Sequence, residues 1–366
     1  ILFFVLLFAI SHRAQVLNTS PFSRYGIGEM NTIQSAHYFS WGNITSPISD
    51  PQYININNPA SYSSFLKYNP IYNVSLSGKS ALYNSQYNGN ETSSSGSNFG
   101  LNNLTLGFPL TKNWGFVFGI LPVSSLGYNI SNTVPFDTST VSYIFSGDGS
   151  VNRLMIGNGF NLINLGDTTR VSLGFNCSYL FGNLERINSV IYNNPNEYNS
   201  RIQYRSSLSG WSFDAGIQFY KRIKTLSNNK FFLNFGFNYS INSEVSTEND
   251  FFAYTFKYNF SVQEFAKDTL DLKTEISSIY LPNKIEFGFV LGKVHNNNRR
   301  WDLGIQYSLT DWTDFTDNSS FSSLSSFKMG LSSRLSIGYR LTPNLDWSNS
   351  NKSILNKSTF SIGFHQ

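Results

Sequence analysis

The chain has 366 residues, of which 13% are charged and 16% are aromatic, and its formal net charge is +4. So few charged residues are unusual for a soluble enzyme, and they suit a membrane β-barrel with an apolar, aromatic outer band and a small, polar interior. The weak, scattered positive charge excludes a nucleic-acid surface, and the single cysteine, Cys177, excludes a disulfide framework, a Cys-based zinc site and a CxxC redox motif.

Residues 1–10 are apolar throughout and are followed by the sequence SHRAQ. Ten apolar residues are too few to span a bilayer as a helix, but they suit the core of a secretory signal peptide. We predict a signal peptide over residues 1–14, with a buried apolar strand as the alternative. Because neither Met nor a basic leader precedes Ile1, we expect this signal peptide to be truncated at its N-terminus. No cysteine follows the cleavage point, so we expect export without a lipid anchor.

Residues 15–67 show neither strand alternation nor a helical stripe, and they contain four prolines among turn-forming Gly, Asn and Asp residues. We predict that this segment is an irregular hatch, or plug, inside a barrel, because a polar lumen offers partners for irregular backbone. A disordered linker is the alternative, but such a linker seldom carries so many large apolar residues. These residues are Phe22, Tyr25, Ile27, Tyr38, Phe39, Trp41, Tyr53 and Tyr62.

Residues 68–366 alternate with period two, most clearly over 171–182 and 231–242, where large apolar residues alternate with Ser, Gly and Asn. A soluble sandwich and a membrane barrel could both use such strands. Runs of about ten residues with a small polar second face favour the barrel. Tyr and Trp gather near the strand ends, as interfacial girdles do: Trp114, Tyr128, Trp211, Tyr220, Trp301 and Tyr339. We therefore predict an all-β fold, a transmembrane antiparallel β-barrel with an N-terminal plug.

The connections between the predicted strands alternate in length. The short ones are 110–113, 164–169, 223–229 and 295–300, and the long ones are 79–98, 125–150, 185–200, 243–283 and 311–324. Short periplasmic turns and long outer loops are the usual asymmetry of outer-membrane barrels. The first strand, near 68–78, should then run outward, and the hatch should begin on the side of the short turns.

About eleven strands lie between these connections, and the last is 359–365. Bacterial barrels have an even number, so we expect the barrel, 68–366, to be truncated at its C-terminus. A hairpin hidden within 243–283 would add two strands and leave the count odd.

Several short motifs resemble the FadL-like outer-membrane family. The hatch motif Asn58-Pro59-Ala60-Ser61-Tyr62 resembles the family's NPA motif. The strand motif with Trp301, Asp302 and Tyr307, followed by Trp312, is similar to one of its strands, and Leu281-Pro282-Asn283 resembles another of its marks. The hatch opening, with Pro21, Phe22, Arg24, Tyr25 and Gly26, resembles an uncharacterised subgroup related to PorV, the outer-membrane component of type IX secretion.

This resemblance implies a barrel of about fourteen strands, even in number, of which about eleven are present. It also implies a hatch that controls the passage of hydrophobic molecules sideways into the membrane, or, in PorV-like members, a barrel that docks secreted proteins or a translocon. The chain departs from fatty-acid transporters in its Asn/Ser-rich interior and in lacking a basic residue within the NPA region, where Lys67 and Arg24 are the nearest.

The sequence gives no sign of catalysis. Beyond the predicted signal peptide only His37, His295 and His365 could act in a triad or bind a metal, and they are widely separated. Asp311, Asp314 and Asp317 could bind calcium, but their spacing matches no EF-hand loop. We expect no enzyme activity, no metal and no cofactor.

Two functions stay open at this point. The first is a FadL-like channel in the outer membrane of a Gram-negative bacterium, which passes small hydrophobic solutes past the hatch. The alternative is a PorV-like docking barrel of a protein secretion system. The expected partners are outer-membrane lipid, a hydrophobic ligand and secretion-system proteins, with no nucleic acid.

Overall fold

The computed structural model describes residues 20–31, 35–87, 90–137, 139–166, 168–223, 229–258, 263–295, 298–319, 329–345, 355 and 358–366. The predicted signal peptide, residues 1–14, lies outside these described residues. Among the helices of the described ranges, none is long and apolar enough to cross a bilayer.

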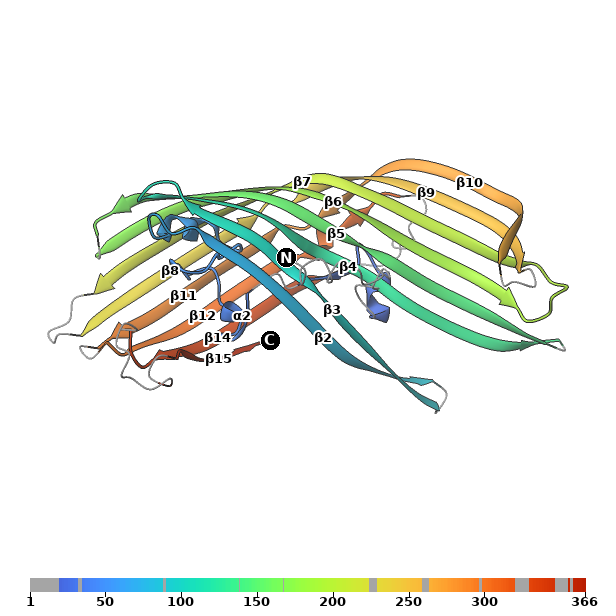
Figure 1. The fold of residues 1–366 in the computed structure, drawn as a ribbon, viewed down its shortest axis with the longest axis horizontal. Coiled ribbons are helices and arrows are strands. Elements are labelled where there is room, and N and C mark those ends of the chain that lie inside the picture. The colour runs from blue at the N-terminus through green and yellow to red at the C-terminus, as the bar shows by residue number, and fades with distance from the viewer. Residues whose placement is uncertain are drawn as a thin grey trace, which may run out of the picture.

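The described residues form one large antiparallel sheet, which confirms the predicted all-β class (Figure 1). Eleven strands follow one another across it: β2 (Ile71–Tyr87), β3 (Asn90–Pro109), β4 (Trp114–Phe136), β5 (Ser139–Asn164), β6 (Thr169–Tyr192), β7 (Asn199–Ile223), β8 (Lys230–Ser240), β11 (Lys284–Val294), β12 (Arg300–Asp311), β14 (Leu331–Thr342) and β15 (Phe360–His365). These are the eleven strands that the sequence predicts. β2 and β15 end the series, and no pairing between described residues joins them, so the sheet is curled but not closed.

Four further strands lie off this series. β9 (Ser243–Tyr258) and β10 (Glu264–Leu281) form a hairpin within the long connection 243–283. β9 pairs with the first half of β7, whereas β8 pairs with the second half. β13 (Thr316–Asp317) pairs with β10, and β1 (Glu29–Met30) pairs with β4.

Most of the predicted long loops are strands, and this corrects the loop assignment. The β2–β3 ladder continues to Tyr87 and Asn90, and the β4–β5 ladder continues to Phe136 and Ser139. Paired strands satisfy each other's backbone donors and acceptors, so polar Ser- and Asn-rich sequence extends the ladders. The sheet therefore rises as tall ribbons on the side of the long connections.

The strands place apolar side chains on the convex face and small polar side chains on the concave face. On β6, Phe175 is 50% exposed while its neighbour Asn176 is 1% exposed. A soluble sandwich would bury the apolar face instead. The pattern is that of a membrane barrel, and we call the interior of the curled sheet the lumen.

The hatch supplies much of the lumen's apolar core, in three clusters. Tyr38, Trp41, Ile44 and Ile48 pack with residues of β8 and β11. A second cluster joins the hatch residues Ile54, Ile56, Tyr62 and Phe65 to β2, β4 and β5. The third surrounds Ile27 with inward side chains, among them Leu126, Leu180 and Leu184. On the side of the long connections, the concave face therefore carries this apolar cluster. The alternating sequence pattern instead predicts small polar residues on the inward face of the strands.

The first described part of the hatch lies toward the long connections, not toward the short turns as predicted. Ser23 Oγ donates to the Gly127 carbonyl of β4 at 3.1 Å, and Ser124 Oγ donates to the Ile27 carbonyl at 2.7 Å. Apolar burial of Ile27 against Leu126 favours this position. Of the described hatch, residues 41–65 contact the glycines of the strands in the half of the lumen near the short turns.

An arginine on the convex face tests the assignment of faces. Ile337→Arg, at the middle of β14, should lower the free energy of unfolding by about 2–4 kcal/mol in lipid vesicles, because it places a charge near the bilayer midplane. Leu331 lies on the same face and strand but near the membrane–water interface. Leu331→Arg should therefore lower the free energy of unfolding by only about 0–1 kcal/mol. Urea titration of both refolded variants measures the difference, and equal costs would contradict the assignment.

Candidate functional site

The candidate site is the contact between the hatch and the strands that surround it. The NPA motif forms a short 3₁₀ helix, η3 (Pro59–Ser64), which Asn58 caps by accepting a hydrogen bond from the Ala60 amide at 3.1 Å. Proline suits the first position of such a turn because its missing donor would be unpaired there. The Asn58 side chain also donates to the Ser46 carbonyl at 2.7 Å. Asn58 therefore fixes both the start of η3 and its contact with the rest of the hatch.

Asn58 and Tyr62 also join the hatch to the barrel strands. The Asn58 amide lies 3.4 Å from the Ile217 carbonyl of β7 and 3.3 Å from the Phe237 carbonyl of β8. The buried Tyr62 hydroxyl donates to Asn176 Oδ1 of β6 at 3.1 Å. Burial raises the pKa of Tyr62, so it stays a neutral donor. The predicted motif is thus a buried structural contact among three strands.

Glycines on the strands make room for the hatch backbone, and we call them the glycine belt. One lies on each strand from β3 to β15 along the main series: Gly107, Gly115, Gly159, Gly174, Gly216, Gly236, Gly288, Gly304, Gly338 and Gly363. At each position the nearest neighbours of an added Cβ include hatch atoms. At Gly174 it would collide with the Pro59 backbone, and at Gly236 with the Ser46 carbonyl.

The belt glycines lie directly opposite one another on most neighbouring strands, and they are displaced by two residues between β3 and β4, β7 and β8, and β11 and β12. Gly159 lies directly opposite Gly115 and Gly174 in the antiparallel register. Gly338 lies between Gly304 and Gly363 in the same way. Interior glycines weaken a strand and often mark a close approach of another backbone, and here they let the hatch lie directly on the sheet.

Amide side chains opposite the hatch hold its free backbone groups. Gln306 Oε1 on β12 accepts from the Thr45 and Ser46 amides at 2.7 and 2.8 Å. Gln218 Nε2 on β7 donates to the Ser46 and Ile48 carbonyls, both at 2.9 Å. Neither glutamine stands out in the sequence. The signal that could mark each of them is a long amide side chain at an inward position of a strand with small inward neighbours.

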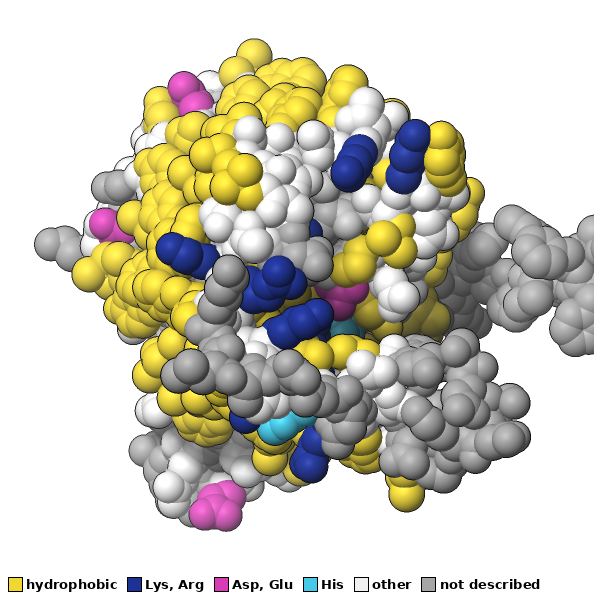
Figure 2. Space-filling model, turned by 90° about the vertical axis from the view of Figure 1, so that its left-hand side faces the viewer, with side chains coloured by type: hydrophobic (Ala, Val, Ile, Leu, Met, Phe, Trp, Pro, Cys, Tyr) yellow, Lys and Arg dark blue, Asp and Glu magenta, His cyan; other side chains and the backbone are white. Residues whose placement is uncertain are grey.

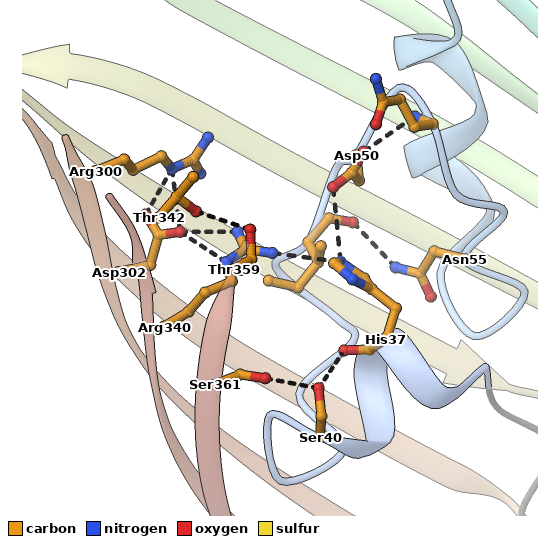
Figure 3. Close-up of polar contacts among 12 residues, drawn as sticks. His37, Ser40, Asp50, Asn55, Arg300, Asp302, Arg340, Thr342, Thr359 and Ser361 are labelled. Carbon is orange, nitrogen blue, oxygen red and sulfur yellow. Dashed lines mark hydrogen bonds and ion pairs between the residues drawn. The ribbon is translucent and has the colours of Figure 1, made fainter. Parts of the chain in front are cut away.

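Asp302 is the centre of a buried ionic cluster near the short turns (Figure 3). Its carboxylate accepts from Arg300 Nε at 2.9 Å and from Arg340 Nε at 2.9 Å. The Arg340 guanidinium lies 4.5 Å from the centre of the Trp41 ring in the hatch. Asp302, predicted as part of a family strand motif, thus orients the arginine on which the hatch packs.

His37 connects this cluster to a loop of the hatch. Its Nε2 lies 3.4 Å from Arg340 Nη1 and 3.7 Å from Asp50 Oδ2 (Figure 3). Its ring stacks on the Tyr53 ring, with the ring centres 4.1 Å apart. His37 lies on the one-turn helix α2 (Ala36–Phe39). Burial is the main cause of the lowered pKa of His37, Asp50 opposes it, and Arg340 adds to it. The folded protein therefore favours the neutral imidazole.

The hatch opening forms a second 3₁₀ helix, η2 (Pro21–Arg24), and lines an apolar cavity of about 400 Å³. Phe22, Tyr25 and Gly26 contribute to its walls together with Trp312 of η4 (Trp312–Asp314). Arg24 lies over its neighbour Tyr25, at 4.8 Å from the ring centre. Arg186 of β6 donates to the Gly26 carbonyl. The structure thus brings the hatch opening and Trp312 together.

The other predicted motif residues lie elsewhere. Trp301 packs against Phe231, and Tyr307 packs against Phe287, both on the convex face away from the hatch. Lys67 lies over the exposed Tyr68 ring at 4.4 Å, so it does not face the NPA motif. Within the described ranges, no group of three or more His, Cys, Asp or Glu side chains is arranged to hold a metal ion.

Removing the Asp302 charge tests the ionic cluster. Asp302→Asn should lower the free energy of unfolding by about 3–5 kcal/mol, because it leaves the buried Arg340 and the partly exposed Arg300 without their carboxylate. Asp271→Asn breaks the exposed pair with Lys273 and should cost about 0–1 kcal/mol. Denaturant titration compares the two variants, and a small loss for Asp302→Asn would show that the cluster does not hold the hatch.

The lowered pKa of His37 predicts a loss of stability in mild acid. The unfolded imidazole titrates near pH 6.5, so the stabilisation is complete above about pH 6.5 and is lost as pH falls through the lower pKa of the folded state. Between pH 7.5 and 5.0, the unfolding midpoint should fall more for the native chain than for His37→Gln. An equal fall of the unfolding midpoint in both proteins would rule out His37 as the titrating group.

Comparison with known proteins gives one family. The family model described as BamG matches residues 1–366. No curated protein matches the chain.

Proposed function

We propose that this chain, which belongs to the BamG family, is an outer-membrane β-barrel protein whose lumen is sealed by its hatch and whose role is to dock other envelope proteins. The single observation that carries this proposal is the seating of the hatch on the glycine belt. Backbone packs on backbone there, around buried side chains such as Trp41 and Tyr62. A hatch held in this way acts as a seal, because its movement would expose many paired polar groups and apolar side chains.

The surface at the short turns supports a docking role. Lys and Arg side chains gather around the centre of this end (Figure 2). Basic residues at or beside these turns include Lys112, Arg170, Lys221, Arg222, Lys230, Lys293, Arg299 and Arg300. Short turns face the periplasm in outer-membrane barrels, and complementary charge speeds and orders protein association. The proposed partner is a periplasmic or membrane protein with an acidic surface, and membership of the BamG family supports a role in outer-membrane β-barrel assembly.

A FadL-like channel is the second candidate. The observation that favours it is the apolar cavity of about 400 Å³ at the hatch opening, since such cavities suit hydrophobic ligands. In this alternative the hatch would move when a hydrophobic solute binds, and the chain would act without a stoichiometric partner.

Conductance in planar bilayers tests the seal. The native protein should stay closed, and Gly338→Val should open the lumen, because its side chain would collide with Trp41. Gly330→Val is the matched control, since nothing lies within 4 Å of an added Cβ there. A native protein that conducts would contradict the proposal, as would a saturable hydrophobic ligand that opens the lumen.

Charge reversal tests docking. The native chain is extracted from its own outer membrane in mild detergent, and the proteins that accompany it are identified by mass spectrometry. We expect one partner protein in a stoichiometric amount. The double variant Lys221→Glu/Lys230→Glu should lose at least about 90% of this partner, because a reversed charge repels an acidic surface. Lys267→Glu, exposed on β10 at the opposite end, should retain it. Retention by both variants, or the absence of any partner, would overturn the docking role.

A further inference from the structure

A second cavity, of about 610 Å³, lies in the lumen beside the hatch, and we call it the chamber. The hatch residues Ile56 and Asn57 line one side, and the β1 segment Glu29–Asn31 lines another. Most of the remaining wall is formed by residues of β5, β7, β8, β11, β12 and β14, and β4, β9, β10 and η4 each contribute one residue. A volume of this size is within the usual range for small-molecule sites.

The chamber wall carries six charged side chains: Glu29, which pairs with Lys79 outside the chamber, and five others that pair mainly with one another. Arg153 lies 3.7 Å from Asp214. Glu286 lies 3.0 Å from Lys284 and 3.7 Å from Arg334. The Glu286 side chain is fully buried, and those of Asp214 and Arg153 are 10% and 15% exposed. The pairs among these five join barrel residues to barrel residues, so they do not hold the hatch in place.

Four buried polar atoms of the chamber's lining residues have no hydrogen-bond partner among the described residues. Two are acceptors, Glu286 Oε2 and Asn238 Oδ1, and two are donors, Arg153 Nε and Arg334 Nε. Asn238, Glu286 and Arg334 lie in one lateral row across the sheet, which Ser308 completes by donating to Glu286 Oε1 at 3.0 Å. A buried polar atom without a partner is costly, so this row suits a bound molecule that supplies the missing donors and acceptors.

We propose that the chamber binds a small zwitterion, namely an amino acid or a short peptide. Its ammonium group would donate to Glu286, and its carboxylate would accept from Arg153 or Arg334. Glu29 is paired with Lys79, and the other charged side chains of the wall are three cations and two carboxylates. This excess of cations favours binding of the ligand's carboxylate. Apolar lining at Met30, Val123 and Leu281 accommodates short aliphatic side chains.

A ligand with a single charge supplies partners for only some of these four polar atoms. An anion alone leaves Glu286 Oε2 without a donor, and a cation alone leaves both arginine Nε groups without an acceptor. A purely hydrophobic solute satisfies none of them. The proposed ligand therefore differs from the hydrophobic solute of the channel alternative. Its binding does not depend on the docking role.

Three peptides of nearly equal size test the proposal by isothermal titration calorimetry on the whole chain in detergent. Trialanine carries both charges, N-acetyl-trialanine carries only the carboxylate, and trialanine amide carries only the ammonium. Trialanine should bind, and each blocked peptide should bind at least about tenfold more weakly, because a buried charge loses its partner. No binding of trialanine to the folded protein, or equal binding of all three, would overturn the proposal.

Two variants assign the charges. Glu286→Gln should weaken trialanine binding to the level of N-acetyl-trialanine and should leave N-acetyl-trialanine unchanged. Thermal unfolding checks that the variant folds. If it does not, the double variant Arg153→Met/Arg334→Met, at side chains that are 15% and 27% exposed, should weaken binding of trialanine and N-acetyl-trialanine but not of trialanine amide. Lys267→Met, outside the chamber, is the control, and the same loss in this control would refute the site.

Discussion

The direct contact of hatch backbone with strand backbone is the constraint on which the rest of this structure depends. A Cβ at Gly174, Gly236 or Gly338 would occupy space that hatch atoms fill. Each main strand from β3 to β15 therefore gives up a side chain at the level of the hatch. Interior glycine weakens a strand, and the apolar side chains that the hatch buries around Trp41 and Tyr62 offset this loss.

This contact also explains why polar side chains near the hatch are long and buried. Irregular backbone cannot pair with itself as strands do, so its amides and carbonyls need other partners. Gln306, Gln218 and Asn58 supply them from fixed positions. The Asp302 cluster adds charge to the same contact, because the arginine that it orients lies over Trp41. Hatch and barrel thus share apolar clusters and hydrogen bonds at several places, which favours a seal over a gate.

The lumen divides into regions of different chemistry. The NPA motif and the Asp302 cluster lie near the short turns, where the hatch fills the interior. Beside the hatch, the chamber contains paired charged side chains and buried polar atoms without a hydrogen-bond partner. The cluster around Ile27 is apolar and lies toward the long connections. Such a division would place the proposed seal and the proposed ligand site in different parts of the lumen, so the two proposals are compatible with each other.

The sequence by itself determined the all-β class, the eleven main strands and the face that each strand turns outward, because side-chain alternation of period two is a local property. The resemblance to the FadL-like family also drew attention to the NPA motif and to the strand motif that contains Asp302. The sequence could not show that the long connections continue as paired strands, since the Ser- and Asn-rich ladders between Lys79 and Asn98 resemble loops in composition. Only the tertiary structure decided which residues meet: the glycine belt, the pairing of Arg340 with Asp302 and Trp41, and the charged row of Asn238, Glu286 and Arg334. These contacts join segments up to about 300 residues apart, and their geometry depends on the curl of the whole sheet rather than on any local pattern.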